Sequence, residues 1–368
     1  MGIRYIWMDA MCLTVDDDEE RDREISRMGE IYQNAEFTIS ADASHNPQGF
    51  LRSPNRDIRP RFVVEYVCAT DKDFHNGAVW VRERGRQSPT LCLHDFPAWG
   101  ADTMDPDICK LQTRAWAFQE RVLPARTFHF GKTEFGYECR SSTTCQCSAF
   151  NVRPRCQTSI VKRRMTELLS SDKEEAERCW REEVVPDFTH RDIYRPIERL
   201  LAVSGIAWKF SQFRRGETYH AGLWESSMAK DLLWHGSYER PSVRQATYIA
   251  PTWSWGSITG GVFYSWWDEV DKISPAFQVK KIDVKPAGAV NKNGNVKPGT
   301  RLRVQGVCLK AFYQSRSENK PDSQGIDVEF GKDTAPGIGV VGHDISMEGS
   351  GSEYAFLPVW DVHEFPKV

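Results

Sequence analysis

The first 42 residues contain the pattern that most restricts the fold: an apolar run, an acidic amphipathic segment and a second apolar run. The run Tyr5–Met8 lacks polar alternation, which is typical of a strand buried on both faces. Asp16, Asp17 and Asp18 are candidate N-caps of a helix, and Phe37–Ala41 has the composition of a second strand. A strand, a helix and a strand in this order predict a βαβ unit, in which the two strands run parallel.

The predicted helix has an apolar stripe that should face the core. Its apolar residues recur three or four positions apart, as expected for one buried face of a helix. Trp7 on the first strand is expected to be structural as well. Cys12 has no histidine within thirty residues that could act as its base, so a packed thiol is expected there. The stripe consists of Ile25, Met28, Ile31, Tyr32 and Ala35.

Composition excludes several classes of protein. The 48 basic residues nearly balance the 51 acidic ones, so duplex nucleic acid is not an expected partner. No apolar run reaches the roughly 18 residues needed to cross a membrane, and Asp9 interrupts the only apolar stretch near the N-terminus. A cytoplasmic protein with reduced thiols is therefore predicted.

Four of the ten cysteines form a cluster: Cys139, Cys145, Cys147 and Cys156. Their spacing lacks the two CxxC knuckles of a standard zinc site, so they are only weak metal ligands, and ordinary thiols are the simpler interpretation.

For the middle of the chain, the sequence predicts helices before and after a β-hairpin. A helix is expected from about Asp107 to Pro124, with Ala115, Phe118 and Val122 facing inward. Strands 127–130 and 133–139 should follow, joined by a turn at Gly131-Lys132. Strands are also expected at 62–67 and 78–81, and helices at 157–185 and 193–213.

From residue 219 onward, aromatic strands and turns are expected. In 251–256 polar and apolar residues alternate, so Trp253 and Trp255 should lie on one face of a strand, as core residues of a second domain. In 300–313 the apolar side chains change face at Gly306, which predicts a β-bulge.

Two blocks, read in order, resemble a known family. Arg4–Cys12 leads into a helix ending Met28–Ala35, and Arg114–Arg126 forms the second block. Together they resemble the HET (heterokaryon incompatibility) domain of filamentous fungi. The chain opens at what is usually the family's second block, and Leu13-Thr14-Val15 stands where the family has Ile-Asn-Gln.

This resemblance implies both a fold and a function. HET domains are linked to programmed cell death after fusion of unlike fungal cells, and they distantly resemble the flavodoxin-like TIR domain. Some TIR domains cleave NAD with a helix glutamate, and Glu24 is the position that matches it. As the catalytic carboxylate, Glu24 would stabilise an oxocarbenium-like transition state, with NAD as substrate. The alternative is a solvated Glu24 paired with Arg27 or Arg21.

Other polar residues are candidates for ligand binding. Asp9 and Asp42 leave the two predicted strands at the same rim, where they would contact a polar ligand or simply cap loops. The second block carries Arg114, Gln119, Glu120 and Arg121 on a helix that also buries the structural residue Trp116. An Arg–Glu pair with a glutamine amide would either lock the helix to the sheet or grip phosphates.

The sequence therefore predicts an α/β protein with an incomplete, TIR-like or flavodoxin-like parallel sheet. The HET domain is expected at 1–140, a cysteine cluster with a charged helical linker at 141–190, and a strand-rich C-terminal region at 191–368. Three functions stay open: signalling in non-self recognition through self-association or protein partners, NAD glycohydrolysis, and a degenerate HET relative without activity.

Overall fold

A computed structural model gives the fold as two compact units. One comprises Tyr32–Thr166, and the other comprises Met1–Ile31 with Glu167–Val368. The structure describes residues 2–13, 16–42, 61–69, 74–82, 110–130, 135–145, 157–169, 172–237, 242–264, 277–288, 290–305, 309–314, 327–330 and 353–356.

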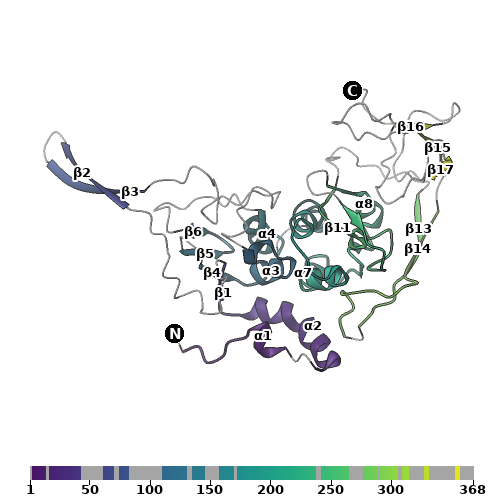
Figure 1. Cartoon of the computed structure of the whole chain (residues 1–368), viewed down its shortest axis with the longest axis horizontal. Coiled ribbons are helices and arrows are strands. Elements are labelled where there is room, and N and C mark those ends of the chain that lie inside the picture. The colour runs from purple at the N-terminus through teal and green to yellow at the C-terminus, as the bar shows by residue number, and fades with distance from the viewer. Residues whose placement is uncertain are drawn as a thin grey trace. The chain divides into compact units, whose positions relative to one another are not determined.

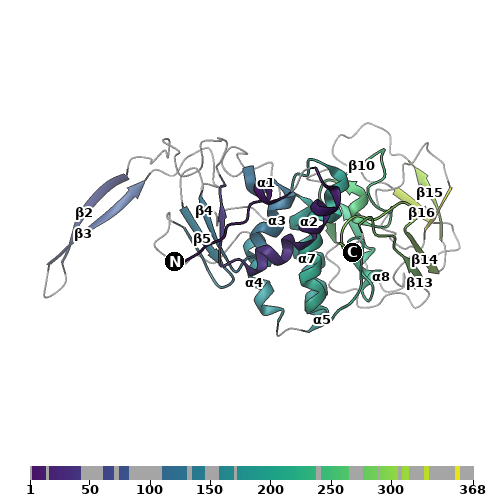
Figure 2. The ribbon, with the colours of Figure 1, turned by 90° about the horizontal axis from the view of Figure 1, so that it is seen from below.

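The unit Tyr32–Thr166 is built on a four-stranded mixed sheet with helices beside it. The strand order is β1-β4-β5-β6; β1 runs parallel to β4, and the remaining pairs are antiparallel. The helices α3 and α4 lie next to this sheet (Figures 1 and 2). The bounds are β1 Thr38–Ser40, η4 Lys110–Thr113, α3 Ala115–Val122, β4 Arg126–Phe130, β5 Phe135–Cys139, β6 Thr143–Cys145 and α4 Gln157–Glu167.

The two faces of this sheet differ in chemistry. Side chains alternate along β4 and β5, so every second residue is fully buried. The less buried face carries a cluster of aromatic rings, with centroids 5.1–5.9 Å apart. The fully buried face carries polar and charged side chains, described below. The aromatic cluster consists of Phe37, Phe128, Phe130, Phe135 and Tyr137.

Several sequence predictions for this unit are confirmed. Ala115, Phe118 and Val122 of α3 are buried. The strands β4 and β5 form the expected hairpin, although its turn lies outside the described residues. The strands expected at 62–67 and 78–81 form an antiparallel hairpin, with β2 at Arg61–Ala69 and β3 at Phe74–Arg82.

The second unit packs its helices around tryptophan. Trp180 is fully buried and contacts the rings of Phe210, Tyr219 and Trp224 edge-on. The expected helix at 193–213 is confirmed as α7, and the charged segment 157–185 is helical but broken into several pieces. These helical elements are α1 Asp9–Cys12, α2 Asp18–Asn34, α5 Lys173–Cys179, the π-helix η5 Trp180–Val184, α6 Val185–Thr189, η6 Pro196–Glu198, α7 Arg199–Phe213, α8 Met228–Asp231 and η7 Trp255–Ser257.

Helix α2 begins as predicted and meets α7 closely. The Asp17 carboxylate accepts hydrogen bonds from the backbone N–H groups of Glu19 and Glu20, so Asp17 acts as the cap. Within the second unit, α2 and α7 lie side by side (Figure 2). Glycines meet at this contact: a Cβ on Gly29 would stand 2.9 Å from the Gly205 Cα.

The strands of the second unit are short and pair locally. The described pairs are β7–β8, β9–β12, β10–β11, β13–β14 and the three-stranded β16-β15-β17. Gly306, where a bulge was expected, lies outside the described residues. The bounds are β7 Tyr219–His220, β8 Leu223–Trp224, β9 Trp234–Gly236, β10 Val243–Arg244, β11 Ile258–Thr259, β12 Val262–Tyr264, β13 Gln278–Asp283, β14 Arg301–Gln305, β15 Leu309–Gln314, β16 Asp327–Phe330 and β17 Glu353–Phe356.

The predicted βαβ unit at the N-terminus is wrong. Tyr5–Met8 is not a strand, and Tyr5 and Ile6 are 89% and 76% exposed. The parallel partner of β1 is β4, from much later in the chain. A strand forms only where a neighbouring strand accepts its backbone hydrogen bonds, and the described residues give Tyr5–Met8 no such neighbour. The expected packed thiol is also wrong, because Cys12 is exposed.

The strand expected at 251–256 is wrong as well. The backbone turns there, since Ser254 N–H donates to the Pro251 carbonyl at 2.9 Å. The Ser254 hydroxyl then caps the short helix η7 by accepting the Gly256 N–H. As a result, Trp255 is fully buried, whereas Trp253 is only half-buried. The α/β class itself is confirmed, with helices in the middle of the chain and strands toward the C-terminus.

Candidate functional site

The fully buried face of the sheet in unit Tyr32–Thr166 carries a cluster of polar and charged side chains. None of them is more than 7% exposed. Burying this many charges is costly unless each finds a partner. We call it the buried polar cluster: Ser40, Asp42, Gln112, Arg121, Thr127, His129, Glu138 and Lys162.

Strand alternation explains how the sheet supplies half of this cluster. Thr127 and His129 are two residues apart on β4 and share the buried face. In register, Thr127 lies opposite Glu138 of β5, and His129 lies beside Ser40 of β1. The sheet therefore places these four side chains as neighbours on one face.

His129 joins the two carboxylates of the cluster. Its Nδ1 is 2.8 Å from Asp42 Oδ2, and its Nε2 is 3.1 Å from Glu138 Oε2. Two ionised carboxylates both need a donor, so the geometry suits a doubly protonated imidazolium. Burial by itself lowers the pKa of His129, but the charge and hydrogen bond of Asp42 outweigh it, and the pKa is raised above its ordinary value.

The other contacts close a ring. Arg121 Nε donates to Glu138 Oε2 at 2.8 Å, and Nη2 reaches Oε1 at 3.3 Å. The Gln112 amide nitrogen donates to Asp42 Oδ1 at 2.6 Å, while its oxygen accepts from Arg121 at 3.3 Å. The ring therefore runs from Asp42 through His129, Glu138, Arg121 and Gln112 back to Asp42.

The pKa shifts follow from these partners. Burial tends to raise the pKa of Asp42 and of Glu138, but their cationic neighbours have the larger effect. The Asp42 pKa is lowered beside His129. The Glu138 pKa is lowered well below its usual range beside Arg121 and Lys162. The carboxylates stabilise the fold until the pH falls through these lowered values. The His129 imidazolium stabilises it until the pH rises through its raised value.

Lys162 reaches the same cluster from helix α4. Its ammonium group donates to Thr127 Oγ1 at 2.7 Å and lies 4.0 Å from Glu138 Oε2. Burial lowers the Lys162 pKa to about 8 in spite of the Glu138 charge. The cluster thus pairs the carboxylates of Asp42 and Glu138 with the cationic side chains of Arg121, Lys162 and His129. It carries no uncompensated negative charge.

This geometry favours a structural lock rather than an open catalytic centre. His129 and Lys162 are fully buried, and Asp42 is 1% exposed, so no substrate reaches them in this structure. The cluster ties α3 to the sheet through Arg121 and Glu138, and ties the exit of β1 to the same sheet through Asp42 and His129. It fixes the relative positions of α3, α4 and the strands.

The sequence-predicted residues are only partly brought together. Asp42 and Arg121 belong to the buried polar cluster, and Arg121 makes the helix-to-sheet pair, but with Glu138 of β5. Gln119 is buried in α3, Glu120 is half-buried, and Arg114 is exposed at the helix start. Trp116 is half-buried, as are Trp7 and Tyr32, whereas Met28 is 3% exposed.

The two acidic candidates of the other unit have local partners. Asp9 is exposed in the first turn of α1, where Met8 is the N-cap, and its carboxylate accepts the N–H of the next residue, Ala10, at 2.7 Å. Glu24 forms an ion pair with Arg27 at 3.0 Å on the surface of α2. This contact is the surface-pair alternative weighed from the sequence.

Cys139 is the one described member of the cysteine cluster whose side chain can be examined. Burial raises its pKa, but hydrogen bonds with Ser141 and Ser142 outweigh burial and lower it to about 6. Among the described residues, no group of three or more His, Cys, Asp or Glu side chains could hold a metal ion. Cys147 and Cys156 lie outside them, and so does the side chain of Cys145.

Sequence reasoning missed Gln112, His129, Glu138 and Lys162. A signal for two of them was present. In the predicted hairpin, Thr127 and His129 share one face with Glu138, opposite a face of aromatic residues. Three polar residues on the face turned away from an aromatic cluster indicate a buried polar network when helices cover that face.

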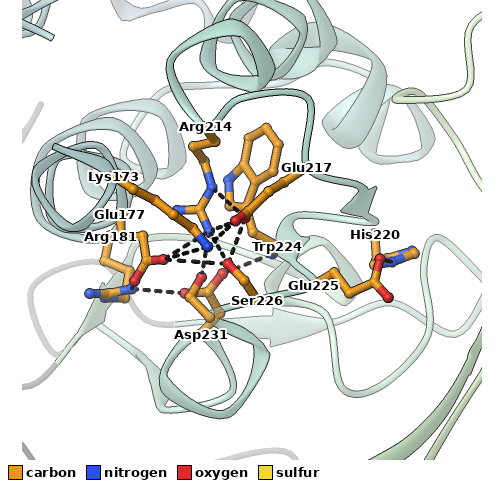
Figure 3. A network of polar contacts seen from close by, with 11 residues as sticks. Lys173, Glu177, Arg181, Arg214, Glu217, His220, Trp224, Glu225, Ser226 and Asp231 are labelled. Carbon is orange, nitrogen blue, oxygen red and sulfur yellow. Dashed lines mark hydrogen bonds and ion pairs between the residues drawn. The ribbon is translucent and has the colours of Figure 1, made fainter. Parts of the chain in front are cut away.

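A second charged network lies in the other unit (Figure 3). Arg214 is fully buried, contacts Glu177 at 3.4 Å and Glu217 at 2.9 Å, and stacks over the Trp224 ring. Asp231 is also fully buried and pairs with Arg181 at 3.1 Å. Figure 3 shows these side chains converging from α5, the π-helix, the C-terminal end of α7, strand β8 and helix α8, which indicates a structural tie between those elements.

Comparison with known families decides the identity of the N-terminal region. Residues 1–120 match the family model described as heterokaryon incompatibility protein (HET). The N-terminal third of the chain is a HET region. It includes α1, α2 and β1, and contributes Asp42 and Gln112 to the buried polar cluster.

The remaining cluster residues lie beyond this match, since Arg121 follows the HET region directly and Lys162 is farther along. No curated protein and no solved structure matches the chain. Among the described residues, no helix combines the length and the apolar character needed to cross a membrane.

Proposed function

We propose that this protein is a HET-type signalling protein of non-self recognition and programmed cell death, which acts by associating with a second copy of itself. The family match supports a heterokaryon-incompatibility type of function. The observation that carries association is an exposed apolar segment in a protein whose strand β1 has one unpaired edge within the described residues.

The sheet of unit Tyr32–Thr166 has an edge that another strand can use. Within the described residues, β1 pairs with β4 on one side and with no strand on the other. Ile39, in the middle of β1, is 46% exposed. An edge strand presents unpaired N–H and C=O groups that another strand can use.

The exposed apolar segment, residues Ile3–Met11, has no regular secondary structure up to Met8 and then enters helix α1. Five of its apolar side chains are exposed by 45% or more and Trp7 is half-buried, although Tyr5–Met8 has the composition of a buried strand. Contiguous exposed apolar side chains mark interaction sites in folded proteins. Addition of such a segment to the edge of β1 in a second copy would pair both sets of backbone groups. These apolar side chains are Ile3, Tyr5, Ile6, Met8 and Met11.

Ile6→Asp tests this proposal. A charge in the exposed apolar segment should weaken self-association of the purified chain, measured by light scattering over a concentration series, and reduce the toxicity of its expression in a fungal host. Tyr194→Asp is the matched control, because Tyr194 is 99% exposed and lies outside the segment. Equal association and toxicity of Ile6→Asp and wild type would contradict the proposal.

NAD glycohydrolysis with Glu24 as the catalytic carboxylate is the other function implied by the family resemblance. The ion pair of Glu24 with Arg27 gives this alternative no specific support. Nicotinamide release from NAD by the wild-type chain, lost in Glu24→Gln, would establish the enzyme in place of the association model. Toxicity without turnover in either protein is the outcome expected here.

A further inference from the structure

A groove on the unit that contains Glu167–Val368 has no role in the function proposed above. It has a volume of about 600 Å³, which lies within the roughly 300–1,000 Å³ typical of small-molecule sites. One wall is the segment Arg244–Trp253 with Ser257, and the other is Thr300–Leu302 at the start of β14. We propose that this groove binds a phosphorylated small molecule with a planar ring, about the size of a nucleoside monophosphate.

The positive charge of two arginines that line the groove favours an anionic ligand. Arg244 and Arg301 both line the groove, and no aspartate or glutamate is among the described residues that line it. Both arginines are exposed, Arg244 on β10 and Arg301 on β14, so their guanidinium groups can meet a ligand from solvent. Guanidinium groups match phosphate oxygens with two parallel hydrogen bonds.

Aromatic and apolar lining supports a ring next to the phosphate. Tyr248 is 37% exposed, and its hydroxyl donates to the Lys297 carbonyl at 3.0 Å, which holds the phenol in place. The backbone of Trp253 is held in turn, because its carbonyl accepts the Trp234 indole N–H at 2.9 Å. Ile249 and Leu302 add apolar surface. Fixed aromatic side chains bind planar rings at low entropic cost.

Isothermal titration calorimetry of the full chain with three probes tests the proposal. AMP should bind, while adenosine and inorganic phosphate should each bind at least tenfold more weakly, because each lacks one half of the recognised chemistry. Arg301→Gln should weaken AMP binding about tenfold or more, through loss of a charge-assisted contact.

Arg303→Gln is the matched control. Arg303 is exposed two residues farther along β14 and does not line the groove, so AMP binding should be unchanged. The proposal is overturned if AMP does not bind to wild type, if adenosine binds as tightly as AMP, or if Arg301→Gln and Arg303→Gln behave alike. If Ile6→Asp associated as wild type does, the self-association proposal would fail, but the AMP titration would be unaffected. The two proposals are therefore tested separately.

Discussion

Glu138 is the carboxylate of the buried polar cluster that has three cationic side chains around it, and its loss should be the most damaging single change at the residue scale. It contacts Arg121, His129 and Lys162 while being fully buried. Glu138→Gln removes the charge and leaves these cations inside. Breaking a buried pair in this way costs about 3–5 kcal/mol, and chemical denaturation of the variant measures it.

The same unit offers a matched surface pair as the control. Glu36 binds Arg126 at 2.8 Å, close to the Arg121–Glu138 distance, but both side chains are about half exposed or more. Glu36→Gln should therefore cost about 0–1 kcal/mol. A comparable loss of stability in Glu138→Gln and Glu36→Gln would show that burial does not increase the contribution of the cluster to the free energy of unfolding.

The cluster also shows why residue roles were only partly predictable. Asp42 and Arg121 were chosen because polar residues stood out beside apolar runs. Gln112 meets Asp42 across 70 positions of sequence, and His129 meets Asp42 across 87. No local pattern encodes such contacts, because they depend on how β1 and β4 pair. The helical face of α3, by contrast, depends only on neighbours three or four residues away, and it was predicted correctly.

At the scale of elements, the contact between α2 and α7 depends on glycine. A Cβ on Gly29 would lie 2.9 Å from Gly205 Cα, which is backbone and cannot rotate away. Alanine would raise intrinsic helix propensity by about 0.8–1 kcal/mol, but overpacking a helix contact costs about 1–3 kcal/mol. Gly29→Ala should therefore lower the melting temperature of the protein, measured by differential scanning fluorimetry.

Glu30→Ala provides the control for this substitution. Glu30 is exposed on the same helix, so alanine there changes propensity without steric conflict, and stability should stay within about 0.5 kcal/mol. If Gly29→Ala raised the melting temperature instead, helix propensity would outweigh packing and the close contact would have no structural importance.

Elements were predictable where their signals were local. The β4–β5 hairpin, the Asp17 cap of α2 and helix α7 each follow from turn, cap or periodic residues within the element. The strand prediction for Tyr5–Met8 is wrong because four apolar residues indicate strand propensity but do not specify a neighbouring strand to pair with. The strand prediction for residues 251–256 is wrong because the Ser254 hydroxyl caps a short helix there, in spite of the alternating pattern. As a result, Trp255 is buried in the core and Trp253 is not.

At the scale of the whole molecule, each compact unit holds its own buried charged network. Unit Tyr32–Thr166 holds the cluster around Glu138, and the unit that contains Glu167–Val368 holds the network around Arg214. Buried networks stabilise the elements that they join, and local opening follows such cooperative groups. Each network is therefore expected to set the opening free energy of its own unit.

Amide hydrogen exchange of two variants tests this expectation. Glu138→Gln should increase exchange in α3, β4 and β5, the elements joined by its ring of contacts, and leave α5 and α7 protected as in wild type. Arg214→Met should do the reverse, because Arg214 closes the C-terminus of α7 and binds Glu177 of α5. Both substitutions leave charged partners buried, so they are comparable in kind. Simultaneous loss of protection in both units for either variant would mean that the chain unfolds as one cooperative body, and the assignment of a separate stabilising network to each unit would have to be abandoned.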